Sequence, residues 1–314
     1  MIQKACFIPF KSLLFVSAYK SLLLKHLSVC AIHRNNAYES PSMHLVDYHV
    51  HTSLCNHAEG GMEAYVRRAE ELGLAEIAFL DHLTLRESGH ENSMSEQEVG
   101  LYHSAIMRLK RKYAGRIMVR AGLEVDHDPE NRARAIGLLE RFSFDIITAS
   151  VHFSDDYNFV SRRAARKGME VPDEAWADSY FHSLRQMLDE PFFDVVGHVD
   201  VFKKFGRKPT PAHLERFGEI FKRMAGLGLV MELNTSGSDH PAGEPYPGPH
   251  LLTMAAQEGV AVTLGSDAHA PREVGRHFGA AVRLLRETGH MNIVLFRGRK
   301  KRLAPLPACP VEVS

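Results

Sequence analysis

From residue 44 onward, short apolar runs alternate with longer amphipathic segments along the chain. The short runs have the length of buried strands, and the longer segments repeat apolar residues at helical spacing. The expected strands span residues 45–51, 75–80, 117–124, 145–151, 194–199, 229–234 and 261–266. The expected helices span residues 61–73, 95–114, 129–142, 173–190, 211–227, 248–259 and 273–288.

Local signals support these boundaries. Thr210 and Pro211 are typical of an N-cap followed by proline at the first helical position, and Gly228 follows the last turn of the same helix. Repeated strand–helix units predict an α/β fold with a parallel sheet. Seven such units predict a seven-stranded or distorted barrel. In such a barrel, function belongs at the carboxyl ends of the strands.

Polar side chains occur at this end of every expected strand. His49 and His51, two residues apart, lie on the same side of the first strand, and His57 follows on its loop. The remaining strands end in the following residues: Asp81 with His82, Glu124, His152, His198, Asn234, and Asp267 with His269.

A metal cluster explains these polar residues at the strand ends better than a separate structural role for each residue does. A lone histidine on a strand is more often a core residue, and an acid after a strand is often a helix cap. Neither explanation covers seven strand ends together, nor the cost of burying so many polar groups without a cation. Imidazole and carboxylate ligands without thiolate suit Zn, Mn or Fe. The number of ligands favours two or three ions bridged by Glu124, and such clusters favour hydrolysis of phosphate esters.

Composition narrows the function further. The 314 residues carry 38 basic and 38 acidic side chains, so the chain lacks the charge expected of a dedicated nucleic-acid binder. A nuclease would also need aromatic platforms, and the chain has a single tryptophan. Four cysteines without CxxC spacing indicate a reducing, cytoplasmic location. We expect a small phosphorylated substrate, no nucleic acid and no membrane, and leave the oligomeric state open.

The first 42 residues differ from the rest because they are basic and apolar and contain almost no acid. A signal peptide or an interfacial helix would need these features. A mis-set start codon would instead give a tail that does not fold with the domain. Lysines interrupt the apolar runs, and none approaches the roughly 20 residues of a membrane span. We therefore expect residues 1–42 to be a disordered leader or the product of a mis-set start, followed by one domain over 43–303 and a tail over 304–314.

The ordered motifs DYHVHTSLCNHA, LDH, GLEVD, ASVHF, GHVD, ELNTSG and GSDAH resemble the PHP (polymerase and histidinol phosphatase) domain. The opening HxHTxxCxHA is most similar to the histidinol-phosphatase branch. The resemblance implies a distorted (β/α)7 barrel of TIM-like type with a trinuclear metal site. It implies that His49, His51 and Asp267 bind one ion, which Glu124 bridges to a second ion held by His152 and His198. His57, His82 and His269 then bind the third ion.

The resemblance also implies the reaction, which is hydrolysis of L-histidinol phosphate to L-histidinol and phosphate in histidine biosynthesis. Glu124, Asp267 and His269 are the expected catalytic residues, and Asp267 or a neighbouring histidine would protonate the leaving group. The expected substrate-binding residues are Arg162, Arg163, Lys204, Arg207 and Asn234.

Two alternatives stay open. The loop after SVHF departs from the branch's usual aromatic- and proline-containing stretch, so the substrate could be another small phosphate, a nucleotide or phosphotyrosine. The chain could also be a metal-stabilised scaffold without turnover, although that state predicts lost ligands and none is missing.

Overall fold

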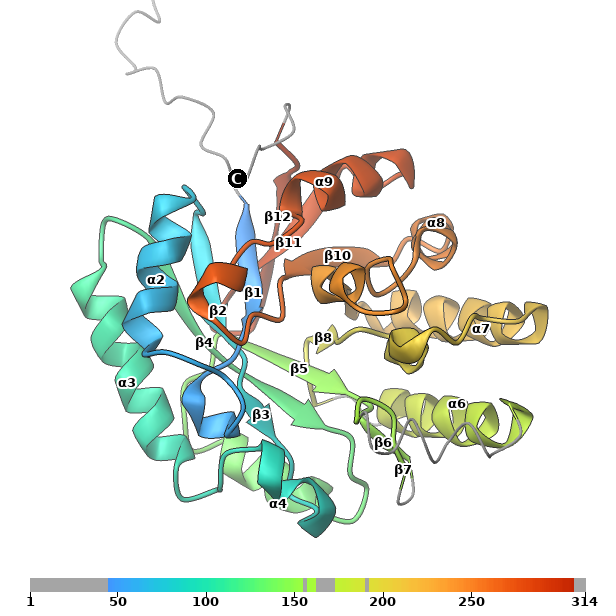
Figure 1. Ribbon diagram of the computed structural model, residues 1–314, viewed down its shortest axis with the longest axis horizontal. Coiled ribbons are helices and arrows are strands. Elements are labelled where there is room, and N and C mark those ends of the chain that lie inside the picture. The colour runs from blue at the N-terminus through green and yellow to red at the C-terminus, as the bar shows by residue number, and fades with distance from the viewer. Residues whose placement is uncertain (1–44, 155–156, 162–172, 190–191, 308–314) are drawn as a thin grey trace, which may run out of the picture. The chain divides into compact units, whose positions relative to one another are not determined.

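The computed structural model describes residues 45–154, 157–161, 173–189 and 192–307. The expected leader over residues 1–42 and the end of the expected tail lie outside these ranges. Within them, strands and helices alternate as the sequence predicts, and the strands form a parallel sheet in the order β1-β2-β4-β5-β8-β9-β10 (Figure 1). These strands are β1 (Val46–Val50), β2 (Glu76–Phe79), β4 (Met118–Asp126), β5 (Ile146–Ser150), β8 (Val195–Val196), β9 (Val230–Asn234) and β10 (Ala261–Gly265).

The sheet curls into a nearly closed barrel. Its first and last strands meet through a parallel bridge between Val50 and Ala268, where the His51 N–H donates to the Ala268 carbonyl at 2.9 Å. The contact lies at the carboxyl ends of β1 and β10, the end at which the polar residues were expected. The predicted distorted seven-stranded barrel is confirmed.

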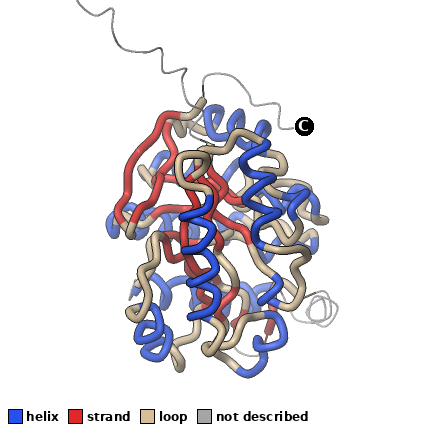
Figure 2. Tube along the Cα trace, turned by 90° about the vertical axis from the view of Figure 1, so that its left-hand side faces the viewer, coloured by secondary structure: helices blue, strands red, loops and turns tan. Residues whose placement is uncertain are grey.

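Helices cover the outside of the strands, as two views at right angles show (Figures 1 and 2). They are α2 (Met62–Glu71), α3 (Val99–Lys112), α4 (Arg132–Leu139), α6 (Asp173–Asp189), α7 (Pro211–Leu227), α8 (Pro249–Gln257) and α9 (Phe278–Glu287). Helix α7 shows why the helices pack on the strands. One of its faces is apolar and buried, and it carries Phe217, Ile220, Phe221 and Met224 at helical spacing. Among the described residues, no helix has the length and apolar character needed to cross a bilayer.

Local chemistry fixes the ends of α7. The Thr210 side chain accepts from the His213 N–H, and the His213 ring accepts from the Thr210 N–H, which completes a capping box. Gly228 ends the helix with φ of 65°, a left-handed conformation that glycine adopts at little cost. The N-cap and C-cap predicted from the sequence are confirmed.

Strand β8 is shorter than the expected 194–199, and Gly197, which follows it, lies directly against β5 with its N–H donating to the Ala149 carbonyl at 2.9 Å. A Cβ at Gly197 would come within 2.3 Å of Ser150 Oγ, so only glycine allows this close approach. The chain leaves the sheet there, and His198 follows immediately on the same end of the barrel.

Further short elements were not expected. Strand β3 (His82–Leu83) pairs with β4 and places His82 opposite Glu124. Strands β6 (Phe153–Ser154) and β7 (Tyr157–Asn158) form a small hairpin after β5, and β11 (Asn292–Arg297) and β12 (Lys300–Pro305) form a larger one beside β10. Among the described residues, five short 3-10 helices lie in loops: η1 (Ser53–Cys55), η2 (Glu87–Asn92), η3 (Val201–Phe205), η4 (Thr235–Asp239) and η5 (Pro271–Glu273).

Candidate metal centre

Glu124 lies at the centre of the polar cluster, near the carboxyl end of β4, and is 1% exposed. Its Oε1 accepts from Ser150 Oγ at 2.6 Å and lies 2.8 Å from His198 Nε2 and 3.4 Å from His152 Nε2. Its Oε2 faces a second group of histidines (His49, His51 and His82) at 3.3, 3.8 and 2.9 Å. The two oxygens of one carboxylate therefore face two different sets of imidazoles.

The histidines of β1 are oriented by carboxylates behind them. His49 Nδ1 lies 2.5 Å from Glu232 Oε1, and His51 Nδ1 lies 3.4 Å from Asp81 Oδ1. Each contact turns the other ring nitrogen, Nε2, toward the centre, where His51 Nε2 reaches Asp267 Oδ1 at 3.0 Å. Carboxylates that fix the ring orientation in this way are typical of metal-binding histidines.

His57, His82 and His269 form the outer part of the cluster. Their ligand atoms all lie within 4.8 Å of one another. His57 Nδ1 lies 2.7 Å from the Cys55 carbonyl, and His269 Nδ1 lies 3.0 Å from the Asp267 carbonyl. A proton on each Nδ1 would complete these hydrogen bonds and leave Nε2 with a lone pair for a cation.

Three further groups of ligand-type atoms satisfy the same 4.8 Å limit, and together they reach across the cluster. They are His49, His51 and Glu124; His82, Glu124 and His152; and His51, Cys55 and His269. The last group contains the buried Cys55 thiol, which belongs to the opening motif but was not among the predicted ligands. The nine side chains predicted as ligands thus form one continuous cluster.

Unpaired buried atoms test whether this cluster suits a cation. His49 Nε2, His51 Nε2 and Glu124 Oε2 are buried and make no hydrogen bond of good geometry to any described residue, although His51 Nε2 lies 3.0 Å from Asp267 Oδ1 and Glu124 Oε2 lies 2.9 Å from His82 Nδ1. Buried polar atoms are normally hydrogen-bonded, so three of them converging on one point are costly unless something positive lies between them. The donor set of imidazole and carboxylate fits divalent zinc, manganese or iron.

The charges of the cluster are strongly coupled. Burial alone would raise the pKa of Glu124, but His49, His152 and His82 hold it well below its usual value. Burial alone would lower the pKa of His49, but Glu232, Glu124 and Asp267 raise it well above its usual value. Burial, with a contribution from His51, lowers the pKa of His82 to about 3. The carboxylate is therefore ionised and depends on nearby positive charge.

The loop after β10 is held in an unusual conformation. Asp267 has a φ of 53°, which is uncommon for a residue other than glycine. Arg276 braces it by donating to the carbonyls of Ser266 and Asp267, both at 2.8 Å. Asp47 accepts from the backbone N–H groups of Ser266 and Gly275 at 2.9 Å. Asp47 thus anchors the loop that carries Asp267, whereas Asp81 contacts a histidine ring.

Glu232 is the main residue that the sequence analysis missed. It is 2% exposed, and besides its contact with His49 it accepts from the His198 N–H at 2.9 Å. A signal was present, because Glu232 interrupts an apolar strand and stands two residues before Asn234, on the same face.

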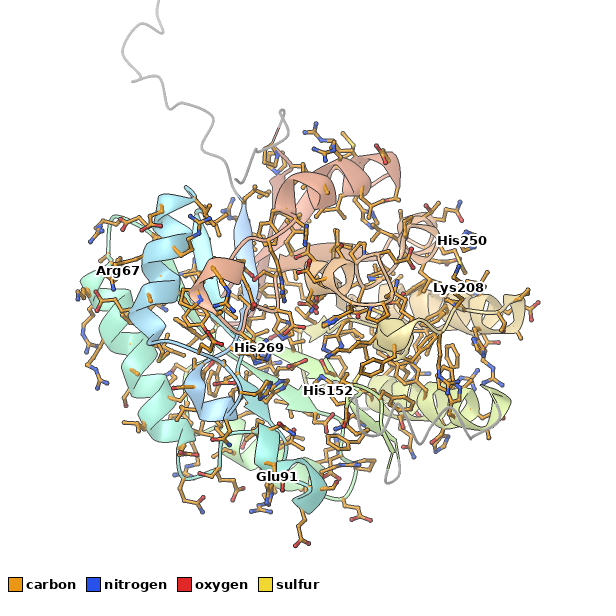
Figure 3. The ribbon with its side chains drawn as sticks, viewed as in Figure 1. Arg67, Glu91, His152, Lys208, His250 and His269 are labelled. Carbon is orange, nitrogen blue, oxygen red and sulfur yellow. The ribbon has the colours of Figure 1, made fainter. Side chains whose placement is uncertain are left out.

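A cavity of about 440 Å³ opens beside the cluster. Six of the nine predicted ligands line it, and Asp267 is the one carboxylate among these six. In Figure 3, His152 and His269 lie near the middle of the view, whereas Arg67, Glu91, Lys208 and His250 lie toward its edges. The lining ligands are His57, His82, His152, His198, Asp267 and His269.

The predicted substrate-binding residues have different positions. Lys204 lines the cavity, and Asn234 is buried beside it with its amide nitrogen 3.3 Å from Asp267 Oδ2. Arg207 lines a separate cavity and lies over the Trp176 ring at 4.7 Å, because Gly206, with φ of 94°, turns the chain after η3. Arg162 and Arg163 lie outside the described residues.

The neighbouring lysine, Lys203, is engaged by acidic side chains of the protein itself. Lys203 is 1% exposed, and its Nζ lies 2.8 Å from both Asp200 Oδ2 and Glu244 Oε1. Its charge is neutralised inside the protein, so it contributes to the packing of the loop after η4.

The barrel and its cluster define the class of protein. The model of the PHP domain family matches residues 47–236, and the chain belongs to this family. The probable histidinol-phosphatase of Deinococcus radiodurans is 33% identical over 82% of this chain and 98% of that protein. The histidinol-phosphatase of Lactococcus lactis is 24% identical over 82% of this chain and 96% of that protein.

A solved structure shows the same fold. It is the histidinol phosphate phosphatase of Lactococcus lactis complexed with Zn, L-histidinol and phosphate, with a TM-score of 0.71 and 22% identity. The likeness covers 82% of this chain and 99% of that one. Family and cluster together place the chain among the PHP-family phosphoesterases.

Proposed function

We propose that this protein is a metal-dependent phosphomonoesterase that hydrolyses L-histidinol phosphate to L-histidinol and inorganic phosphate. The observation that carries the metal dependence is the convergence of His49 Nε2, His51 Nε2 and Glu124 Oε2, which are buried and lack a hydrogen bond of good geometry to any described residue. The substrate is supported by the names of the relatives and by the histidinol and phosphate in the Lactococcus structure.

In this proposal, the nine side chains hold two or three ions. His49, His51 and Asp267 hold the first, and Glu124 bridges it to a second held by His152 and His198. His57, His82 and His269 hold the third. Divalent ions bound here would supply Lewis-acid stabilisation of the charge that develops on the phosphoryl oxygens.

The chain itself orients these groups and gives the substrate access from one side. Glu232 and Asp81 fix the rings of His49 and His51, and both rings are fully buried. The side chains of Asp267 and His269 are 19% and 26% exposed and line the cavity. Both side chains therefore lie on the open side of the cluster, where a substrate would enter.

A substrate panel tests the proposal. The metal-loaded protein is assayed for phosphate release from histidinol phosphate, nucleoside monophosphates, phosphotyrosine and sugar phosphates. We expect kcat/KM for histidinol phosphate to exceed the others by at least about 100-fold, because a site that hydrogen-bonds its substrate discriminates strongly against analogues lacking those groups. Similar kcat/KM values for all compounds, or a higher value for a compound other than histidinol phosphate, would mean that the substrate is another phosphate. No release from any compound would favour the scaffold alternative.

A further inference from the structure

His240 is a histidine of the cavity wall that plays no part in the proposed metal cluster. It follows η4 directly, in the loop after β9, and lines the cavity together with Ser236, Asp267 and Lys204. Its side chain is partly buried, and its ring makes no hydrogen bond to any described residue. Both ring nitrogens are thus open to a ligand.

The loop that carries His240 is fixed to the metal centre. The Asn234 side chain accepts from the Ser236 N–H at 3.0 Å and caps η4, and Ser236 Oγ donates to Asp267 Oδ2 at 3.1 Å. The His240 N–H donates to the Gly237 carbonyl at 3.2 Å, and the His240 carbonyl accepts from the Gly243 N–H at 2.8 Å. His240 therefore has a defined position relative to Asp267.

Two cationic side chains lie near His240 on the cavity wall. Lys204 and Arg276 line the same cavity, and their charges act on the ring against those of Asp267 and Asp239. Burial lowers the pKa of His240, and Lys204 lowers it further, so the imidazole is neutral with one N–H to donate. Arg276 already donates to Ser266, Asp267 and Asp239, so His240 is better placed than Arg276 to meet a ligand.

A phosphoryl group matches this wall. It is anionic, offers only acceptor oxygens once ionised, and must lie beside Asp267 if the metals act on it. We propose that His240 contacts the substrate by donating a hydrogen bond from its imidazole to the phosphoryl group. The inference rests on the proposed function and deepens it, because it names a substrate-binding residue outside the metal ligands.

The test is the affinity of zinc-loaded protein for inorganic phosphate, measured by calorimetry for wild type, His240→Ala and His240→Gln. Loss of a hydrogen bond to a charged group predicts about 10- to 100-fold weaker phosphate binding for His240→Ala. The amide of His240→Gln should recover part of this loss. KM for histidinol phosphate should rise in parallel, while bound zinc and melting temperature stay unchanged.

His250→Ala is the matched control. His250 is exposed and lines the separate cavity near Arg207, so its loss should leave phosphate affinity unchanged (Figure 3). Wild-type phosphate affinity in His240→Ala would overturn the inference, as would a loss of zinc or of melting temperature, which would indicate a structural role. Wild-type protein that binds no phosphate would overturn it too.

The calorimetric measurement separates this inference from the proposed function. If histidinol phosphate is not hydrolysed but His240→Ala still weakens phosphate binding, the proposed substrate is wrong and the role of His240 stands. If hydrolysis occurs and phosphate binding is unchanged, His240 alone is wrongly assigned.

Discussion

At the scale of single residues, the site depends on which nitrogen of each histidine faces the cluster. His49, His57 and His269 are held through Nδ1 by Glu232, the Cys55 carbonyl and the Asp267 carbonyl, so that Nε2 faces inward. His82 is reversed, with Nδ1 lying 2.9 Å from Glu124 Oε2. These orientations come from partners far along the chain, so they could not be inferred from the spacing of the histidines.

Glu124→Gln tests the centre of the cluster. An amide cannot bridge two cations with two negatively charged oxygens, so we expect phosphate release to fall by at least about 1,000-fold, toward the upper range for removal of a key electrostatic group. Far-ultraviolet circular dichroism should stay unchanged if the fold is kept. Near-normal turnover would show that Glu124 is not the bridge.

Glu232→Gln tests the residue that the sequence analysis missed. A neutral amide would weaken the hold on His49 and could not accept from both His49 and the His198 N–H. We expect metal affinity to fall about 10- to 100-fold, as is typical for loss of such a partner, measured by competition with a chelator. Glu96→Gln is the control: it changes a surface ion pair with Arg134 and should leave metal affinity unchanged.

At the scale of elements, the hairpin of β11 and β12, here called the terminal hairpin, stabilises the base of the barrel, which is the end opposite the site. Its two-residue turn, Gly298 and Arg299, has φ of 54° and 63°, as a tight hairpin turn requires. The Gly298 N–H donates to Asp145 Oδ1 at 2.9 Å, and Arg299 Nε donates to Asp194 Oδ2 at 2.9 Å. Asp145 and Asp194 directly precede β5 and β8, so the hairpin is tied to the end of the barrel opposite the site.

Asp145→Asn should lower stability without changing catalysis. The carboxylate also accepts from Lys110 Nζ at 2.9 Å and from the Ala121 N–H at 3.2 Å. Losing some of these hydrogen bonds should lower the free energy of unfolding by about 2 kcal/mol, measured by urea unfolding. kcat/KM should stay at the wild-type value. A parallel loss of activity would show that the base of the barrel affects the site.

The pH dependence of the stability difference between wild type and Asp145→Asn follows from the Asp145 pKa. Burial would raise that pKa, but Lys110 and two backbone N–H groups lower it below the usual value. A lowered pKa in the folded state stabilises the protein above the unfolded value of about 3.9, and the contribution disappears as pH falls through the folded value. The stability difference between wild type and Asp145→Asn should be full above about pH 5 and should narrow progressively as pH falls below about 4.

At the scale of the whole molecule, barrel closure joins distant parts of the chain. The bridge between Val50 and Ala268 places His49 and His51 of the first strand beside Asp267 and His269, which follow the last barrel strand. The site therefore needs the complete ring of strands. Because its central charge is buried, a bound cation would stabilise the folded state.

Removing the metal should weaken the whole domain. Ligands that bind only the folded state stabilise it by about 4 kcal/mol when present at 1,000 times Kd, which for a domain of this size corresponds to about 10 °C in Tm. We expect chelation to lower Tm by about this amount and to abolish phosphate release. Adding back zinc, manganese or iron should restore both. An unchanged Tm after verified metal removal would contradict a metal-stabilised cluster.

Much of this architecture could be read from the chain, because strands and helices of regular length leave strong periodic patterns. The patterns located all seven barrel strands, and α7 matches its predicted range of 211–227. Strand β3 is too short to leave a periodic signal, and the terminal hairpin was overlooked although its apolar run ends at a Gly298–Arg299 turn. Strand β8 was expected to be longer because the apolar run 194–199 does not show where the chain leaves the sheet.

The sequence by itself determined the barrel, the end at which its chemistry lies and the nine candidate ligands, since strand periodicity fixes which end and face a residue occupies. Only the tertiary structure decided the role of Glu232, the separation of Arg207 from the site and the burial of Lys203 in an ion pair. These depend on contacts between loops and strands far apart in the chain, and no local pattern encodes such distances.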